Sequence, residues 1–382
     1  MKMEELKAAG WLTLKDIFAL HSTNKKSVDA LSFGVDWIIN SFRATAGKGS
    51  SASYSLFRGW DVGYPETTGY IIPTLLNFSS FSSSRQDEIL EICLAAGDWL
   101  LSMQKTDGSF SGHGTEKSFV FDTGQIIFGM AALYRLTSHT KYKEAIISSA
   151  NWIIKCQSEG GEWGDQSFDG RAHPYDTRVA WSLLEAFDIV GDERYRSAAV
   201  SQLDWALGRI SENAWINNLE ISAKGESFLH FIAYATEGLL VSGKILSNQS
   251  YIDGAAMVIN KLYLLSMKDN LKSFYSKNWE STSGSFCLTG ISQTAILFKK
   301  YFNICDDESF LLEAERLDSF VAKRQVIKTK WSGISGGISG SSPIWGRYMP
   351  FKFINWATKF YIDSILVGES ITKKENFNKY AG

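Results

Sequence analysis

Asp36-Trp37-Ile38-Ile39, Asp98-Trp99-Leu100-Leu101, Asn151-Trp152-Ile153-Ile154 and Asp204-Trp205-Ala206-Leu207 repeat one pattern along the chain. Each segment places a polar residue and a tryptophan before two apolar residues. The tryptophans are 62, 53 and 53 residues apart. A recurrence at this period indicates a repeated supersecondary unit that buries its apolar face only against its neighbours.

A second motif recurs between the tryptophan segments. It reads Thr67-Thr68-Gly69-Tyr70, Asp122-Thr123-Gly124-Gln125, Asp176-Thr177-Arg178-Val179 and, more weakly, Leu288-Thr289-Gly290-Ile291. When Gly129 is matched to Gly238, the anchor positions are 68, 123, 177, 232 and 289, with spacings of 55, 54, 55 and 57 residues. Each period therefore has room for two helices.

The two motifs predict two sets of six helices. The tryptophan helices mix apolar residues at helical spacing with charged residues, which is typical of helices with one solvated face. They are expected near 24–43, 84–104, 140–157, 192–210, 248–266 and 307–325. The second set is more apolar around its circumference and is expected near 66–79, 122–137, 176–190, 231–246, 288–303 and 354–367. Six outer and six inner helices predict an all-α fold, the (α/α)6 toroid, as a single domain over residues 1–382.

Composition and charge narrow the class of protein. The chain has 382 residues, 45% of them hydrophobic, and a net charge of −2, as expected for a globular protein with no basic surface for nucleic acid. No stretch approaches the roughly 18 to 20 apolar residues of a membrane helix. The four cysteines lie far apart, and the first residues lack the apolar core of a signal peptide. We therefore expect a cytoplasmic protein, and the sequence leaves its oligomeric state open.

Two segments that follow outer helices resemble a known repeat. Gln104-Lys105-Thr106-Asp107-Gly108-Ser109-Phe110 and Gln157-Ser158-Glu159-Gly160-Gly161-Glu162-Trp163 are similar to the QW repeat of the squalene-cyclase and protein-prenyltransferase superfamily. The resemblance implies an α/α toroid in which the glutamine and the aromatic residue tie successive hairpins together. The chain has no DxDD acid motif of the triterpene cyclases. The same toroid is also the scaffold of six-hairpin glycosidases, uronate lyases and sugar epimerases.

Polar and aromatic residues gather in the predicted loops that lead from outer to inner helices. In a toroid these loops open at one mouth, where the amino ends of the inner helices offer partial positive charge. The candidate catalytic residues are Glu66, Asp122, Asp176, His230, Tyr234 and Glu237. The candidate substrate-binding residues are Arg58, Trp60, Tyr64, Tyr70, Gln125, Tyr175, Arg178, Gln293, Trp345, Arg347 and Tyr348.

Several candidates also have a purely structural interpretation. Asp122 and Asp176 can serve as helix caps, since an aspartate there accepts backbone N–H bonds. His230, Tyr234 and Glu237 share one helix face and can form a buried hydrogen-bonded network. The arginines can pair with nearby carboxylates or hold a substrate carboxylate or phosphate.

The cavity has three interpretations. In the favoured one, a carbohydrate-active enzyme acts on an oligosaccharide or glycan precursor. Hydrolysis would use two carboxyl groups, whereas a uronate lyase or epimerase would use a base such as Tyr234 or His230. The alternatives are an isoprenoid cyclase or prenyltransferase-like enzyme and a non-catalytic glycan-binding protein. No phosphate loop or ligand spacing points to an organic cofactor or a metal.

Overall fold

The computed structural model describes residues 3–18, 27–220, 225–269, 271–327, 329–375 and 379–382. Its α-helices, in chain order, are α1 (Met3–Ile17), α2 (Ser27–Ala44), α3 (Pro65–Phe81), α4 (Gln86–Met103), α5 (Val120–Thr137), α6 (Thr140–Lys155), α7 (Thr177–Val190), α8 (Glu193–Leu207), α9 (Leu229–Leu246), α10 (Gln249–Asp269), α11 (Leu288–Cys305), α12 (Glu308–Ala322) and α13 (Asn355–Lys373). All twelve predicted helices form, and their bounds agree to within three residues except that α13 continues to Lys373, past the predicted end at 367. Residues 24–26 of the first predicted helix lie outside the described residues. Helix α1 was not predicted.

Short strands, which were not predicted, join some of the helices. The order β2 (Gly59–Trp60), β1 (Ser53–Ser55), β7 (Lys352–Ile354) makes one antiparallel sheet, in which Tyr54 is opposite both Trp60 and Phe353. Two further antiparallel pairs join β3 (Glu226–Phe228) to β4 (Phe274–Ser276) and β5 (Phe286–Cys287) to β6 (Ser341–Ser342). Among the described residues the strands are only two or three residues long, so the fold is all-α as predicted.

The chain forms two compact units. Unit 1 spans residues 1–63, 226–230 and 262–378, and unit 2 spans residues 64–225, 231–261 and 379–382. All three small sheets belong to unit 1. Unit 2 contains α3 to α8 and most of α9. The single domain over residues 1–382 stays a prediction.

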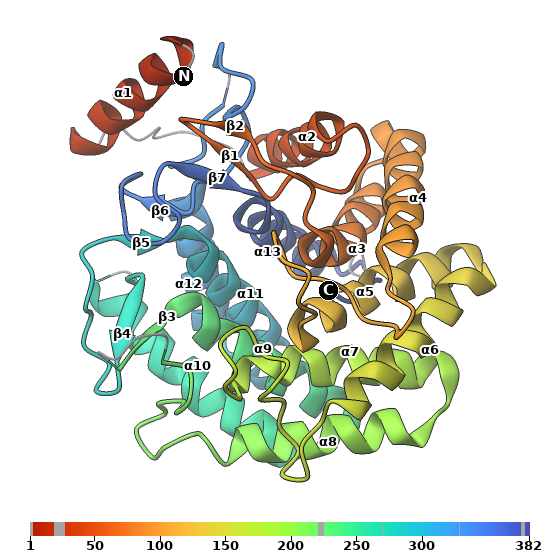
Figure 1. The fold of residues 1–382 in the computed structure, drawn as a ribbon. Coiled ribbons are helices and arrows are strands. Elements are labelled where there is room, and N and C mark those ends of the chain that lie inside the picture. The colour runs from red at the N-terminus through yellow and green to blue at the C-terminus, as the bar shows by residue number, and fades with distance from the viewer. Residues whose placement is uncertain (1–2, 19–26, 221–224, 270, 328, 376–378) are drawn as a thin grey trace. The chain divides into compact units, whose positions relative to one another are not determined.

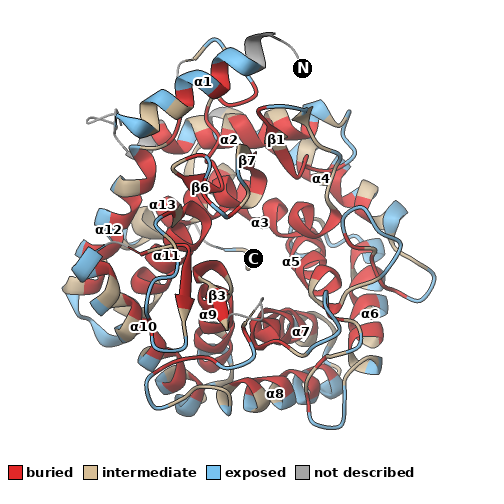
Figure 2. Cartoon of the chain, turned by 60° about the vertical axis from the view of Figure 1, so that its left-hand side comes forward, coloured by how far each residue is buried: buried red, intermediate tan, exposed pale blue. Residues whose placement is uncertain are grey.

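Glycines bring the inner helices of unit 2 into close contact. A Cβ atom on Gly129 of α5 would lie 2.4 Å from the carbonyl oxygen of Gly69 in α3, and a Cβ on Gly124 would lie 3.1 Å from Val179 and Ser182 of α7. Figure 2 shows the result: α3, α5 and α7 are buried along most of their length, whereas α8 exposes one side. The predicted difference between inner and outer helices is confirmed here.

Unit 1 contains helices from both ends of the sequence. Helix α13 packs against α2 and α11, and α11 packs against α12. The ammonium group of Lys299, which is buried, donates to Asp318 and to the Ser364 backbone oxygen at 2.6 Å. The ion pair satisfies the buried charges of α11 and α12, and the bond to Ser364 joins them to α13.

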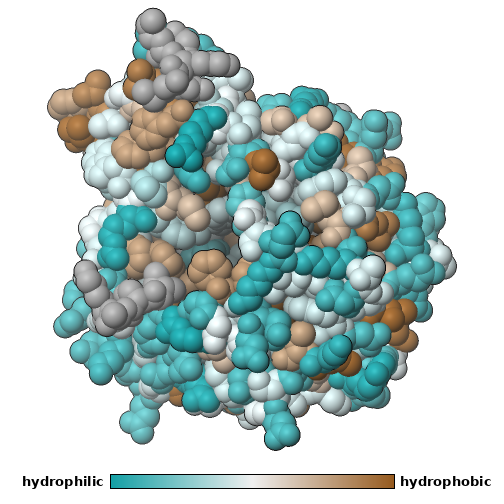
Figure 3. Space-filling model, viewed as in Figure 1, coloured by the Kyte–Doolittle hydropathy of each residue, from teal (hydrophilic) through white to brown (hydrophobic). Residues whose placement is uncertain are grey.

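Helix α1 exposes apolar side chains. Leu14, Ile17 and Phe18 are 55%, 58% and 65% exposed, whereas Ala8 and Leu12 are buried. Figure 3 shows the corresponding hydrophobic surface at the upper left, over the region labelled α1 in Figure 1. In the described part of the chain, no helix is long and apolar enough to cross a bilayer.

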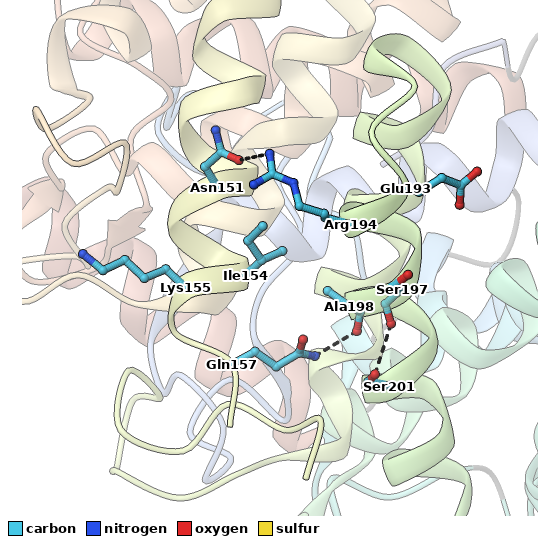
Figure 4. A pocket seen from close by; sticks show the side chains of 9 residues that line it. All are labelled: Asn151, Ile154, Lys155, Gln157, Glu193, Arg194, Ser197, Ala198 and Ser201. Carbon is cyan, nitrogen blue, oxygen red and sulfur yellow. Dashed lines mark hydrogen bonds between the residues drawn. The ribbon is translucent and has the colours of Figure 1, made fainter. Parts of the chain in front are cut away.

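The glutamines of the QW-like segments tie neighbouring outer helices together. Gln157, just after α6, donates from Nε2 to the carbonyl oxygen of Ala198 in α8 at 2.8 Å, as Figure 4 shows, and to Gly161 at 2.6 Å. Gln104, after α4, donates to Ala145 of α6 at 3.0 Å. The structure adds a tie that was not predicted: Gln325, after α12, donates to Ala30 of α2 at 2.9 Å.

A glycine in the left-handed region accompanies each of these glutamines. Gly108, Gly161 and Gly336 have φ values of +93°, +94° and +95°. A Cβ atom on any of them would lie between 2.0 and 2.5 Å from a backbone oxygen of the next outer helix. A side chain is therefore excluded both by the backbone conformation and by the close contact.

Replacing Gly161 with alanine will destabilise unit 2. The positive φ and the predicted contact at 2.5 Å with the Ser201 oxygen together should lower the free energy of unfolding by about 3 kcal/mol, measured by urea denaturation. Gly170→Ala is the matched control: its φ is +74°, but nothing lies within 4 Å of the new Cβ, so the loss should be about 1 kcal/mol. Equal losses in the two variants would show that the helix contact is unimportant.

Candidate active site

Three carboxyl groups lie at the amino ends of neighbouring inner helices in unit 2. Glu66 is in the first turn of α3, Asp122 is in the first turn of α5, and Asp176 directly precedes α7. Their exposed fractions are 7%, 5% and 1%. No side-chain capping bond is made at the start of α5 or α7, so simple helix capping does not account for either aspartate. A buried carboxyl group needs another reason for its position.

Tyr64 links the carboxyl groups of Glu66 and Asp122. Its hydroxyl donates to Asp122 Oδ1 at 3.1 Å, and it also hydrogen-bonds with Glu66. A phenol has only one proton, so it can donate to just one carboxyl group at a time. The other carboxyl group can bond to the phenol oxygen only by donating a proton of its own. A Glu66–Tyr64–Asp122 unit in which both bonds are made therefore holds at least one carboxylic acid.

Burial raises the pKa of both carboxyl groups in this unit. It raises the pKa of Glu66 to about 7, although hydrogen bonding with Tyr64 and Tyr70 and the charge of Arg178 act in the opposite direction. Burial also raises the pKa of Asp122 well above its usual range, and the nearby charge of Glu66 raises it further. Two such carboxyl groups titrate as a pair, which resists losing both protons.

Asp176 is a third carboxyl group held toward its protonated form. Burial raises the pKa of Asp176 well above the usual range, although a hydrogen bond with the His173 backbone acts in the opposite direction. Its Oδ2 atom has no hydrogen-bond partner among the described residues. Tyr175, next to it, packs edge-on against Phe121 at 5.3 Å between ring centroids, and Phe121 directly precedes Asp122. The amino ends of α5 and α7 thus meet through the residues beside the two aspartates.

Arg178 carries a buried positive charge that lowers the pKa of Glu66. It is fully buried, and it donates from Nη1 to Glu237 Oε2 at 2.6 Å and from Nε to Gln125 Oε1 at 2.9 Å. Its guanidinium group lies 5.0 Å from the ring centroid of Tyr234. The ion pair and the ring of Tyr234 hold α5, α7 and α9 together, and the pair is one of the contacts expected for Arg178. The catalytic role of Glu237 and the substrate-binding role of Arg178 stay predictions.

The pH dependence of stability will report the protonation of Glu66. Because its folded-state pKa is raised from 4.5 to about 7, the stability that it contributes is fully present below about pH 4.5 and is lost as the pH rises through about 7. Glu66→Gln removes this loss, so the variant should gain stability relative to the wild type between pH 5 and pH 8 in urea titrations. The exposed Glu159→Gln serves as the control and should follow the wild type. A wild-type pH profile in Glu66→Gln would contradict the raised pKa.

The remaining candidates from α9 and later lie mainly in unit 1. His230 Nδ1 is 2.8 Å from Gln293 Oε1, and its ring centroid is 5.7 Å from that of Tyr348. Trp356 donates from Nε1 to the Tyr348 hydroxyl at 2.8 Å. Because an amide oxygen is only an acceptor, Nδ1 of His230 carries the proton in this bond. His230, Gln293, Tyr348 and Trp356 form a second cluster, and all four residues belong to unit 1.

The other candidate residues of unit 1 lie outside this second cluster. Arg347 pairs with the buried Glu226, with Nη1 and Oε2 2.9 Å apart, and lies over the ring of Phe274 at 4.1 Å. Glu226 was not predicted as a partner. The Trp60 ring packs against Trp37 at 5.1 Å. Two further candidates, Arg58 and Trp345, are exposed on loops of unit 1.

In the ranges that the structure describes, no group of three or more His, Cys, Asp or Glu side chains is arranged to hold a metal ion.

A groove on the surface of unit 2 lies between α6 and α8, where Asn151 and Arg194 face each other in Figure 4. It is separate from the three buried carboxyl groups. The candidate active site is therefore built from the amino ends of α3, α5 and α7.

Comparison with known proteins gives matches in structure only. No family model matches the chain, and no curated protein matches its sequence. An unsaturated glucuronyl hydrolase specific for heparin is similar with a TM-score of 0.71 and 12% identity, over 91% of this chain and 98% of that one. The unsaturated glucuronyl hydrolase of Streptococcus agalactiae has a TM-score of 0.71 and 13% identity, over 95% and 96%. That of Bacillus sp. GL1, responsible for the degradation of glycosaminoglycan, has a TM-score of 0.71 and 12% identity, over 89% and 96%.

The chain has the (α/α)6 toroid fold. The toroid predicted from the repeats is thereby confirmed. Within unit 2 the amino ends of α3, α5 and α7 lie together, because Tyr64 bonds to Asp122 and Phe121 packs on Tyr175. At 12% to 13% identity the matches establish this fold, and the roles of individual side chains come from their own chemistry.

Proposed function

We propose that this toroid is a glycosidase that cleaves a uronate-bearing oligosaccharide by acid–base catalysis at the amino ends of α3, α5 and α7. The observation that carries the proposal is the set of three buried carboxyl groups there, each with a raised pKa. Enzymes that protonate a glycosidic oxygen need a carboxylic acid that is still protonated near neutral pH. A glycan-binding protein would have no need for it.

Asp176 is the proposed proton donor. It is buried and biased toward the carboxylic acid, and its Oδ2 atom makes no hydrogen bond within the described residues. An acid whose oxygen is already engaged by the protein would have to break that bond before reaching a substrate. Asp176 can therefore donate directly to an oxygen of the bound sugar.

The Glu66–Tyr64–Asp122 unit is the proposed proton acceptor. When one of its two carboxyl groups is ionised, the unit can take a proton from the attacking water and redistribute it through the Tyr64 hydroxyl. The bond to the leaving sugar breaks as Asp176 supplies a proton to it. The incoming water loses a proton to the unit, so the charges balance over one turnover.

Base-initiated lyase or epimerase chemistry receives less support from the site. Burial raises the pKa of Tyr234 far above neutrality, and the charge of Glu66 raises it further, so its phenol is a poor base. The favoured substrate class follows from the names of the similar solved structures, which act on unsaturated glucuronyl groups, in one case those of heparin. We extend that class, a glycan ending in a uronate, to this chain as a proposal.

We also propose a cytoplasmic location. All four cysteines are free thiols, and two of them, Cys93 and Cys287, are buried. Unpaired cysteines are typical of proteins kept in a reducing compartment. The expected substrate is then an imported oligosaccharide or a glycan precursor that forms inside the cell.

The proposal is tested by incubating the protein with saturated and unsaturated uronate oligosaccharides while new reducing ends and the ultraviolet absorbance of the C=C bond are recorded together. Hydrolysis predicts new reducing ends with no gain in absorbance, and loss of absorbance if the unsaturated ring is released and opens. A gain in absorbance would instead establish a lyase. If neither reducing ends nor absorbance change with any of the oligosaccharides, the result would contradict a glycosidase.

A further inference from the structure

Phe168 is an exposed aromatic side chain in the loop between α6 and α7, beside the start of α5. At 80% it has the largest exposed fraction of any large apolar side chain that the structure describes. Its ring centroid lies 6.1 Å from that of Phe119, the residue before α5, and the Lys117 ammonium group lies over the Phe119 ring at 5.4 Å. A single exposed apolar side chain is common on a protein surface, but here two aromatic rings and a cation lie together.

The loop holds Phe168 outward through specific bonds. Gly170 donates its backbone N–H to Ser167 at 3.3 Å, and the Ser167 hydroxyl donates to Trp163 at 3.0 Å. Asp169, the next residue, accepts from Arg171 and lies 2.8 Å from the ring of His173. The backbone turn that carries Phe168 is therefore tied on both sides.

The aromatic pair is continuous with the proposed active site. The backbone N–H of Val120, the first residue of α5, donates to Gln166 at 3.1 Å and fastens this loop to α5. Gly112 lies between Phe119 and Asp122: a Cβ atom there would be 2.4 Å from the Phe119 ring and 3.1 Å from Asp122 Oδ2. The Phe119 ring and the Asp122 carboxyl group thus flank the same glycine.

We propose that Phe168 and Phe119, with Lys117 beside them, form an outer subsite that binds a sugar ring beyond the bond that is cleaved. This inference rests on the proposed function. The apolar face of a pyranose ring packs well on an exposed aromatic ring, and the ammonium group can donate to hydroxyl, carboxylate or sulfate oxygens of the same sugar. The subsite would make the enzyme favour longer oligosaccharides over disaccharides.

The test compares unsaturated di- and tetrasaccharides prepared from heparin. In Phe168→Ala the ratio of kcat/KM for the tetrasaccharide to that for the disaccharide should fall about 3- to 10-fold. Phe168→Trp should keep the ratio, because it keeps an aromatic face. The control is Leu136→Ala, which truncates an apolar side chain, 40% exposed, at the other end of α5 and should leave the ratio unchanged. An unchanged ratio in Phe168→Ala would overturn the subsite.

A binding measurement separates this inference from the proposed function. If the wild-type protein turns over neither saccharide, the glycosidase proposal fails, and the tetrasaccharide is then titrated calorimetrically into the wild type and into Phe168→Ala. Weaker binding by the variant would still support the subsite. Equal binding, or no binding to the wild type, would overturn it.

Discussion

Replacing Asp176 with asparagine will lower kcat on the oligosaccharide by about 10²- to 10⁴-fold, because an amide cannot donate the proton that the leaving sugar needs. Stability should respond in the opposite sense. The folded-state pKa of Asp176 is raised, so its contribution to stability is present below pH 3.8 and is lost as the pH rises through the raised value. At neutral pH the variant should therefore be at least as stable as the wild type in urea denaturation.

The matched control for this prediction is Asp165→Asn. Asp165 is an exposed aspartate in the loop before α7, so the same chemical change there should leave both kcat and stability unaltered. A loss of stability in Asp176→Asn that parallels its loss of activity would indicate a structural carboxylate. Full activity in that variant would remove Asp176 from the mechanism. Together the two measurements separate a proton donor from a group that only supports the fold.

Replacing Arg178 with methionine will lower the free energy of unfolding by about 3–5 kcal/mol. Arg178 is fully buried, and its ion pair with Glu237 spans 2.6 Å between side chains that are 0% and 4% exposed. Methionine fills much of the volume but leaves the Glu237 carboxylate without this cation in a low-dielectric interior. The variant should also raise the pKa of Glu66 further, since Arg178 lowers it in the wild type.

Two further variants test the origin of the loss. The double variant Arg178→Met/Glu237→Leu should recover most of the stability, because it removes both charges. Arg135→Met removes another arginine that joins α5 to α7, but Arg135 is 29% exposed and pairs with Glu185 and Asp188 nearer to solvent. Its loss should be about 1 kcal/mol. A double variant no more stable than Arg178→Met would show that packing, and not charge, dominates.

The repeats predicted the fold because both motifs carry the helical period and recur at a nearly constant spacing. Gln104 and Gln157 marked two of the ties between outer helices. The third glutamine, Gln325, was missed because eleven residues separate it from its glycine, Gly336, and the spacing of the motif is lost. The short strands were missed because two or three residues are too few to show an alternating pattern.

The candidate site could be predicted only in part. Asp122 and Asp176 occur at matching places in the repeat, and Glu66 lies beside the corresponding threonines, so all three were named from their sequence positions. The Tyr64 bridge and the pairing of Arg178 with Glu237 depend on distances between residues more than 50 positions apart, which no local pattern encodes. Phe168 was overlooked for another reason: exposure is a property of the folded loop.

The division of the chain into units has a consequence for its synthesis. Unit 2 is nearly continuous in sequence, from residue 64 to residue 261, whereas unit 1 joins residues 1–63 to residues 262–378. The bond from Gln325 to Ala30 closes over 295 residues. Because the chain is synthesised from its amino end, unit 2 can form its core before α12 and α13, against which α2 packs, have been made. We therefore expect the nascent chain to hold the apolar face of α2 exposed until α12 and α13 have been translated, and to be most dependent on chaperones during that interval.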